Sequence, residues 1–214
     1  MNNWEGGMSL ILYTNPMSRG RIAHWMLEET GAAYETRYLR YGPEMSSAEY
    51  AAVNPMQKVP AIVHDGKVVT ECAAICLYLA DAFPKADLAP PLDARADYYR
   101  WMMFAAGPWE AASTNRSLNV EVSAEASGMV GYGDFGRTLE VLQSAVPEDG
   151  YLLGPKFSAL DVFMGSQISW GSQFGSIPKT PRVEAYLGRL QSRRGYILAS
   201  ELDDAAMATY GPAG

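Results

Sequence analysis

The sequence predicts an α/β domain with a four-stranded mixed sheet, followed by a domain built only from helices. Strand-like and helix-like segments alternate in the first part of the chain, a proline-rich stretch follows at residues 84–92, and strand patterns stop after it. The order β-α-β, then β-β-α, places a parallel pair and a hairpin in one sheet with helices on its faces. With 214 residues, the chain can form two domains with ample cores. We therefore expect an α/β domain over residues 8–84, a linker over 85–93 and a helical domain over 94–214.

The first elements follow from short apolar runs and the breaks between them. We expect a buried strand at 9–13, then a helix that starts at Ser18 and ends before Gly31, a suitable glycine for a helix C-terminus. A strand of mixed polarity at 34–41 suits the edge of the sheet, and a short helix or turn is expected at 46–53.

A hairpin is expected within residues 54–72. Asp65-Gly66 is a dipeptide typical of a type I′ turn between two strands. Pro60 opens the first of these strands, where its missing N–H is tolerated, and only X–Pro bonds reach the cis form at low cost. If the Val59–Pro60 bond is cis, the backbone of Val59 turns outward and offers its N–H and carbonyl to a ligand.

A helix is expected to start at Thr70-Glu71-Cys72 and to continue to Phe83. The unpaired N–H groups at such a helix N-terminus form a ready site for a carboxylate. Together with the Val59 backbone, this helix start suits an extended, peptide-like ligand that carries a carboxylate. An ordinary hairpin followed by a capped helix explains the same residues equally well, so both interpretations stay open on these residues alone.

The second domain is expected to contain only helices. Their predicted ranges are 94–104, 109–118, 129–146, 162–170 and, as the last regular helix, 181–193. Gly107-Pro108 predicts a kink between the first two helices. Ser158 and Asp161 have the spacing of a capping box, in which each side chain accepts the backbone amide of the other residue. The helix behind this box is apolar nearly all round, so we expect it to be buried.

Charge and hydropathy exclude two classes of partner. The net charge of -7 and the pI of about 4.9 argue against a nucleic-acid surface, and Arg193-Arg194 is an isolated basic pair. No apolar run is long enough to span a membrane. Residues 1–7 lack the basic start of a signal peptide, so we expect them to form a loose leader before the first strand.

The cysteine and histidine content argues against a metal site. Cys72 and Cys76 lie four residues apart on one predicted helix, which is poor geometry for a disulfide, and His24 and His64 are the only histidines. Neither a cysteine cluster nor a zinc site is supported. Reduced thiols of this kind are typical of the cytoplasm, where we expect the protein to be located.

The order of these features resembles that of the cytosolic glutathione transferase family, from about Met8 to the last predicted helix. Three segments carry the resemblance: Lys58-Val59-Pro60-Ala61, Glu71-Cys72-Ala73-Ala74-Ile75 and Ser158-Ala159-Leu160-Asp161. The first has the form of the cis-proline corner of a thioredoxin-like fold. The second stands where the family usually has Glu or Asp, then Ser, then small residues. The third is the family's capping box in the core helix of the second domain.

The resemblance implies a thioredoxin-like N-terminal domain that binds glutathione as co-substrate and an all-helical domain that binds the second substrate. The implied reaction is conjugation of the glutathione thiolate to small apolar electrophiles, a detoxification chemistry, by a homodimer without a metal. Two alternatives remain. One is a non-catalytic glutathione-binding or regulatory protein of the same fold. The other is a glutathione-dependent disulfide reductase or peroxidase, which is weakened because no cysteine lies between the first strand and the first helix.

The resemblance also assigns residues to glutathione binding. They are Gln57, Lys58, Val59, Pro60, Glu71, Cys72 and Arg19. Val59 would pair its backbone with the cysteinyl part. Glu71 would take the ammonium group, and the backbone N–H of Cys72 would take the γ-glutamyl carboxylate. Lys58, helped by Gln57, would face the glycyl carboxylate.

We expect the residue that stabilises the glutathione thiolate to lie between the first strand and the first helix. A free thiol has a pKa of about 8.5, so a donor aimed at the sulfur is needed to hold the anion. Ser18 is our choice, because serine- and cysteine-type members carry their activating residue just before this helix, whose N-terminus adds positive potential. A tyrosine-type member would have its tyrosine at the position of Asn15. The tyrosine mechanism is therefore absent unless the Tyr13 hydroxyl reaches the sulfur instead. Arg19 could donate instead, and Ser18 could simply cap the helix.

Two further assignments stay open. Cys72 replaces the family's usual serine, and it either fills space or, with a pKa lowered at the helix N-terminus, forms a mixed disulfide. For the second substrate, the resemblance points to the aromatic helices after the linker, although an aromatic stripe at helical spacing is also typical of a core. The predicted lining residues are Asn15, Trp101, Phe104, Trp109 and Tyr132.

Overall fold

The computed structural model describes residues 9–211, so residues 1–7, expected to form a leader, lie outside the described part. The chain divides into two compact units: Met1–Ala86 with Arg193–Gly214, and Asp87–Ser192. This division differs from the predicted helical domain over 94–214. The C-terminal segment belongs to the first unit because its helix packs against the first helix of the α/β domain.

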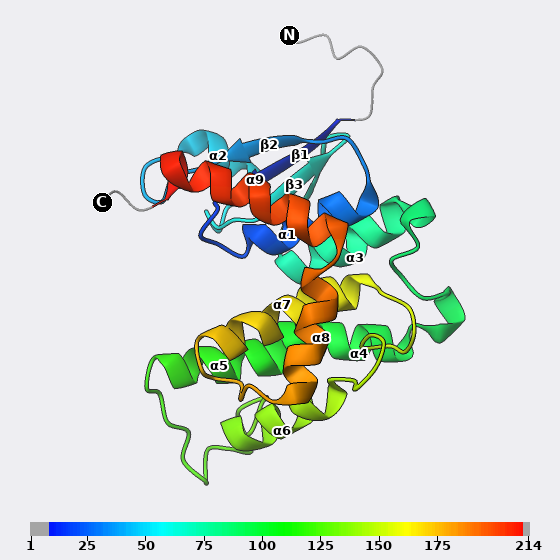
Figure 1. Ribbon diagram of the computed structural model, residues 1–214. Helices are drawn as coiled ribbons and strands as arrows, with labels where there is room; N and C mark the ends of the chain where they lie inside the picture. The colour runs from blue at the N-terminus through cyan, green and yellow to red at the C-terminus, as the bar shows by residue number, and fades with distance from the viewer. Residues whose placement is uncertain (1–8, 212–214) are drawn as a thin grey trace. The chain divides into compact units, whose positions relative to one another are not determined.

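The first unit contains a mixed four-stranded sheet, as the sequence predicts, with strand order β2-β1-β3-β4. Its strands are β1 (Leu10–Thr14), β2 (Glu35–Tyr38), β3 (Ala61–His64) and β4 (Lys67–Val69). β1 is parallel to β2 and antiparallel to β3. β3 and β4 form the predicted hairpin, in which Asp65 and Gly66 have φ values of 49° and 76°. β2 lies at an edge of the sheet, as its mixed polarity indicates (Figure 1).

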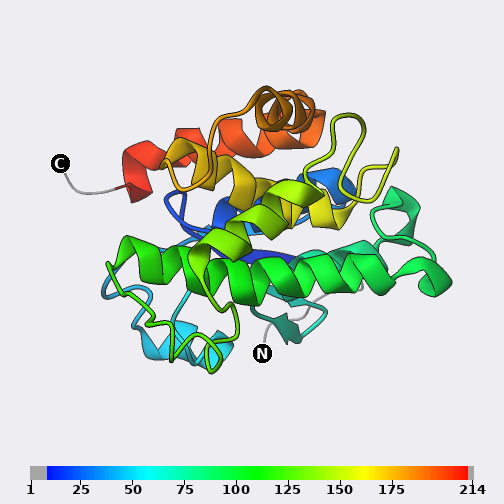
Figure 2. The ribbon, with the colours of Figure 1, turned by 90° about the horizontal axis from the view of Figure 1, so that it is seen from below.

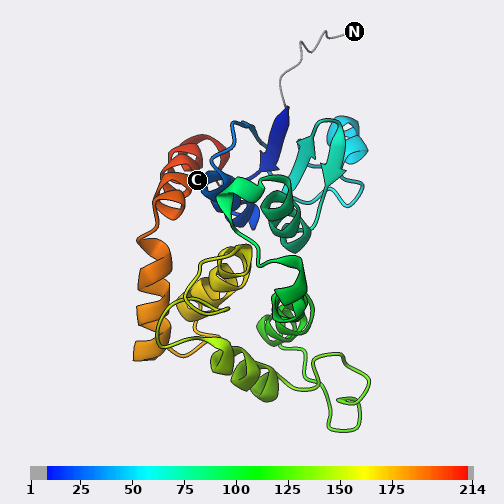
Figure 3. The ribbon, with the colours of Figure 1, turned by 90° about the vertical axis from the view of Figure 1, so that its right-hand side faces the viewer.

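Helices pack on the sheet of this unit. They are α1 (Gly20–Thr30), α2 (Ala48–Val53), α3 (Cys72–Ala82) and α9 (Arg194–Tyr210). α1 ends at Gly31, whose φ of 66° is the left-handed conformation expected of a C-terminal glycine. α1 contacts β1, α3 and α9, whereas α2 lies on the other side of the sheet (Figure 3). The large apolar side chains of the sheet and of α1 that are at most 1% exposed form the core: Leu12, Ile62, Ile22, Met26 and Leu27.

Helix α9 differs from the prediction, which ends the last regular helix at residue 193. The buried residues of α9 are Gly195, Ala199 and Asp203, two small and one charged. A stripe of this kind has no hydrophobic periodicity, so the sequence does not reveal it. It lets α9 come close to α1, since a Cβ on Gly195 would lie 2.8 Å from the carboxyl carbon of Glu29. Figures 1 and 3 show α9 (red and orange) running beside α1 (blue).

The second unit is helical, as predicted. Its α-helices are α4 (Ala96–Phe104), α5 (Glu110–Ser117), α6 (Phe135–Ala145), α7 (Ala159–Gln173) and α8 (Pro181–Gln191). The kink predicted at Pro108 is a π-helical turn, Ala105–Trp109, which joins α4 to α5 so that they form one long helix in Figure 2 (green). Short 3₁₀ turns at Pro84–Ala86 and Leu92–Ala94 occupy the region predicted as a linker.

Helix α6 starts later than predicted. Residues 129–134 lie outside it, because Gly133 has a φ of 70° and the Asp134 side chain caps the helix by accepting the amide of Arg137. The two glycines in this segment disfavour helix more than its apolar residues favour it.

The predicted capping box at the start of α7 is confirmed. Ser158 and Asp161 each accept the backbone amide of the other residue. The Asp161 carboxylate also accepts the amide of Leu152 at 2.8 Å and the hydroxyl of Tyr186 at 2.9 Å. This buried carboxylate therefore ties the start of α7 to the preceding turn and to α8.

Candidate functional site

The candidate site lies in the first unit, where three segments meet at one end of the sheet. β1 ends beside the start of β3, since Tyr13 pairs with Ala61. β4 ends beside the same strand, since Val69 pairs with Ile62. The segments at these strand ends are the β1–α1 turn (residues 15–19), the corner before β3 and the start of α3. The predicted glutathione-binding residues all lie on these three segments.

The corner before β3 contains a cis peptide bond between Val59 and Pro60. The preceding carbonyl, that of Lys58, accepts the hydroxyl of Tyr50 at 2.6 Å and the side-chain amide of Asn54 at 2.7 Å. Burial raises the pKa of Tyr50 to about 12, so this hydroxyl keeps its proton at neutral pH. Within residues 9–211 the backbone N–H and carbonyl of Val59 make no hydrogen bond, so both are available to a ligand.

Tyr50 and Asn54 were not predicted as parts of the site. Their only signal in the sequence is a spacing of four residues, which places them on one face at the end of a short helix. Their partner is a backbone carbonyl, which no sequence pattern marks.

Side chains of opposite charge flank the corner. Lys58 and Gln57 are exposed before it, and Glu71 is exposed at the start of α3. Glu71 has a φ of 63° and a ψ of 115°, a conformation that costs a non-glycine residue about 1–3 kcal/mol. Strain of this size persists where the surrounding structure holds a side chain in one place. The arrangement can receive a zwitterionic ligand, with its ammonium group at Glu71 and a carboxylate at Lys58.

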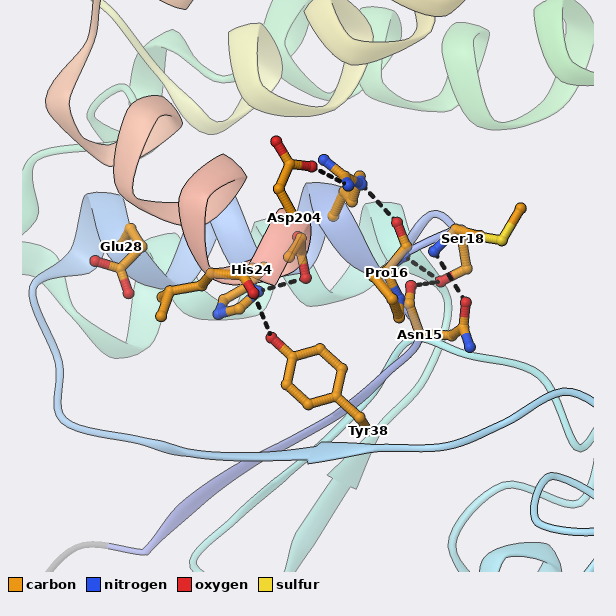
Figure 4. Close-up of polar contacts among 12 residues, drawn as sticks. Asn15, Pro16, Ser18, His24, Glu28, Tyr38 and Asp204 are labelled. Carbon is orange, nitrogen blue, oxygen red and sulfur yellow. Dashed lines mark hydrogen bonds and ion pairs between the residues drawn. The ribbon is translucent and has the colours of Figure 1, made fainter. Parts of the chain in front are cut away.

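The hydroxyl of Ser18 is engaged within its own turn. It donates to the carbonyl of Asn15 at 2.7 Å and accepts the amide of Gly20 at 2.9 Å (Figure 4). The contact with Gly20 supports the start of α1, so Ser18 contributes to capping as well as standing beside the site. A thiolate bound here would compete with the Asn15 carbonyl for the single hydroxyl hydrogen of Ser18.

Asn15 is not available as a pocket residue, contrary to the prediction. Its side chain is fully buried. Nδ2 donates to the carbonyl of Leu39 at 2.8 Å and to that of Tyr210 at 3.2 Å, and Oδ1 accepts the amide of Met17 at 2.9 Å. Because these bonds occupy its polar atoms, Asn15 holds the turn in shape and does not face a substrate.

Tyr13 is held on the α2 side of the sheet. Its hydroxyl accepts from Arg37 at 3.0 Å, and its ring centroid lies 5.4 Å from that of Tyr50. The next residue, Thr14, points the other way, toward Gly20 at the start of α1. This alternation disfavours Tyr13 as the thiol donor.

The two cysteines are free thiols packed behind the site. The Sγ atom of Cys72 donates to the carbonyl of Arg19 at 3.6 Å, which links the start of α3 to the β1–α1 turn. A hydrogen bond with Cys72 and burial together raise the pKa of Cys76. These contacts agree better with a space-filling and bridging role for Cys72 than with a reactive thiolate.

The predicted aromatic pocket residues all lie in the second unit. Trp101 and Phe104 are half-buried and form an edge-to-face pair with centroids 5.4 Å apart. Tyr132 is half-buried, and its hydroxyl accepts from Asn115 at 2.8 Å. Trp109 is only 1% exposed, so it belongs to the core of this unit, contrary to the prediction.

The described part of the chain contains neither a cluster of metal ligands nor a membrane-spanning helix. Between residues 9 and 211, no group of three or more His, Cys, Asp or Glu side chains is arranged to hold a metal ion. In the same range, no helix combines the length and apolar character that crossing a membrane requires.

Comparison with known proteins agrees with this geometry. A family model described as the glutathione S-transferase N-terminal domain matches residues 8–81. Protein LigF of Sphingobium sp. is 51% identical over 80 residues, which cover 36% of this chain and 31% of that protein. Glutathione S-transferase theta-1 of Bos taurus is 26% identical over 211 residues, covering 91% of this chain and 87% of that protein. A sphingomonad glutathione S-transferase, solved in complex with glutathione, is 27% identical with a TM-score of 0.69, covering 91% and 98%.

The sheet, the cis-proline corner and the first-unit helices define a thioredoxin-like domain, which is followed by a helical domain. Residues 8–81 match the glutathione S-transferase N-terminal domain, and over about nine-tenths of its length the chain is similar to cytosolic-type glutathione S-transferases.

Proposed function

We propose that the chain catalyses attack of the glutathione thiolate on a small apolar electrophile. The observation that carries this proposal is the placement of three groups at one end of the sheet. They are the exposed carboxylate of Glu71, the unpaired backbone of Val59 and the exposed ammonium of Lys58. Glutathione carries matching groups, with an ammonium and a carboxylate at its γ-glutamyl end, peptide bonds beside its cysteine and a glycyl carboxylate.

Each group then has one task in binding. Glu71 accepts the ammonium of glutathione, and the backbone N–H of Cys72 at the start of α3 donates to the γ-glutamyl carboxylate. Val59 pairs with the cysteinyl part, and Lys58 with Gln57 binds the glycyl carboxylate. These contacts direct the thiol toward the β1–α1 turn, which the Cys72–Arg19 contact holds near the start of α3.

Thiol activation is assigned to Ser18, which makes the chain a serine-type member. Its hydroxyl turns from the Asn15 carbonyl to the thiolate. The turn loses a neutral hydrogen bond, worth about 0.5–1.5 kcal/mol, and gains a charge-assisted bond of roughly twice that strength. The N-terminus of α1 adds positive potential. Arg19, exposed at the same turn, is the second candidate donor. The thiolate then forms a C–S bond with the electrophile, and the leaving group departs with its electron pair.

The electrophile, the assembly and the location complete the proposal. We infer that the aromatic rings of Trp101, Phe104 and Tyr132 contact the electrophile, since these side chains are half-buried and therefore, unlike core residues, remain partly accessible. A homodimer is expected, which light scattering tests directly. A cytoplasmic location is supported by the two free thiols, which a reducing compartment preserves.

Calorimetric titration with glutathione, followed by turnover of an activated aryl halide, tests the proposal. The wild type should bind glutathione and form the thioether. S-methylglutathione, which has no free thiol, should bind without turnover. Absence of glutathione binding would contradict the proposal. Binding without turnover of any electrophile would favour a regulatory glutathione-binding protein, and reduction of a disulfide substrate would favour a reductase.

A further inference from the structure

We propose that helix α9 positions the β1–α1 turn, with Arg21 as the positioning residue and Asp204 of α9 holding it in place. The Arg21 guanidinium makes two directed contacts. Its Nε donates to the carbonyl of Pro16 at 2.5 Å, and its Nη2 pairs with the Asp204 carboxylate at 2.5 Å (Figure 4). Arg21 therefore connects α9 to the backbone of the turn that carries Ser18. The inference rests on the proposed function, because it concerns the turn assigned to thiol activation.

A second contact joins the end of α9 to the same turn. Asn15 Nδ2 donates to the carbonyl of Tyr210, the last residue of α9, at 3.2 Å. Carbonyls in the last turn of a helix have no partner within the helix, so this one is free to accept. The Tyr210 ring is itself held, stacked on Tyr38 with centroids 5.2 Å apart and covered by the Arg40 guanidinium at 5.0 Å.

Other contacts attach α9 to α1 without involving the turn. His24 Nδ1 lies 2.9 Å from the Asp203 carboxylate, and both side chains are almost fully buried (Figure 4). At the far end of α1, the Glu29 carboxylate accepts from Nε and Nη2 of Arg193 at 2.8 and 2.7 Å. α9 therefore stays in place when Asp204 is removed.

The Arg21–Asp204 pair contributes orientation more than stability. The Asp204 side chain is 67% exposed, and ion pairs this exposed contribute little to folding. The planar guanidinium fork fixes the direction of both contacts, which a lysine ammonium cannot do. Without Asp204, the Arg21 guanidinium is no longer held in one orientation, and its hydrogen bond to the Pro16 carbonyl is lost. The Ser18 hydroxyl is then oriented less well toward a bound sulfur. The pKa of the bound thiol then rises toward the free value.

The test compares Asp204→Ala with Glu29→Gln, which weakens the contact with Arg193 at the far end of α1. Amide hydrogen exchange of residues 15–20, measured without glutathione, reports the turn directly. The ultraviolet absorbance of the thiolate during a pH titration reports the pKa of bound glutathione. Steady-state rates separate kcat from KM.

We expect Asp204→Ala to speed amide hydrogen exchange in the turn and to raise the pKa of the bound thiol. It should also lower kcat near pH 6.5 by about 3–10-fold with KM little changed, because a small misplacement of a reacting group is costly. Its unfolding temperature should stay close to that of the wild type. Glu29→Gln should lower the unfolding temperature and leave the turn and the thiol pKa unchanged. Arg21→Lys, which keeps the charge and loses the fork, should behave like Asp204→Ala.

The inference is overturned if Asp204→Ala leaves exchange in the turn unchanged. It is also overturned if Glu29→Gln changes the turn and the thiol pKa as much as Asp204→Ala does. A wild type that fails to bind glutathione would instead refute the proposed function, while the exchange measurement would still decide whether α9 positions the turn.

Discussion

Glu71 allows a test in which stability and binding move in opposite directions. At a φ of 63° and a ψ of 115° a non-glycine residue carries about 1–3 kcal/mol of strain. Glycine adopts positive φ without this strain but costs about 0.5–1 kcal/mol more chain entropy on folding. Glu71→Gly should therefore raise the free energy of unfolding of the ligand-free protein by about 1 kcal/mol.

The same substitution removes the carboxylate that is proposed to receive the ammonium group of glutathione. A hydrogen bond to a charged group is worth about 1.5–3 kcal/mol. The dissociation constant for glutathione should therefore increase by about 10–100-fold. Glu71→Gln is the matched control, because it keeps the strained backbone and the side-chain length but removes the charge. It should weaken binding without increasing stability.

Thermal unfolding without ligand and calorimetric titration with glutathione measure the two effects. For a chain of this size, a gain of 1 kcal/mol should raise the unfolding temperature by about 2–4 °C. A Glu71→Gly variant that is less stable than the wild type would refute the assignment of strain. A variant that binds glutathione as tightly as the wild type would refute the role of the carboxylate.

Two further predictions concern the supports of the site. Because burial raises the pKa of Tyr50 to about 12, the contribution of this side chain to stability is complete below pH 10 and is lost as the pH rises through 12, by roughly 3 kcal/mol. Tyr50→Phe should remove this alkaline loss in urea unfolding at pH 9 and pH 11, and an unchanged pH dependence would contradict the assignment. Gly20→Ala would place a Cβ 1.8 Å from Oγ1 of the buried Thr14, and it should lower the free energy of unfolding by about 1–3 kcal/mol. The control Gly188→Ala, whose Cβ meets nothing within 4 Å, should be neutral or stabilising, so equal losses in both variants would contradict the packing argument.

The parts of the fold that the sequence predicts are those whose physics is local. Asp65-Gly66 specifies its own turn, Gly31 ends its own helix, and Ser158 with Asp161 caps the helix that follows. α9 could not be predicted in this way. Its buried stripe of Gly195, Ala199 and Asp203 becomes informative only once α1 lies against it.

In the candidate site too, residues in local motifs could be predicted and residues that depend on distant contacts could not. The Val59–Pro60 corner and Glu71 stand in short motifs, so the sequence indicates them directly. The burial of Asn15 and Trp109 depends on contacts with distant residues, and sequence spacing does not distinguish a lining side chain from a core side chain. The bond from the Ser18 hydroxyl to the Asn15 carbonyl is likewise a consequence of how the turn folds.

The central claim is that the β1–α1 turn ionises bound glutathione, with Ser18 as the donor to sulfur. A pH titration of thiolate absorbance in the wild type and in Ser18→Ala tests it most directly. Ser18→Thr, which retains a hydroxyl, serves as the control. In the wild type and in Ser18→Thr, the pKa of the bound thiol should lie at least about 1 unit below the free value of about 8.5. In Ser18→Ala, the pKa should return toward the free value, with the affinity for glutathione little changed. The same thiol pKa in the wild type and in Ser18→Ala would contradict the claim.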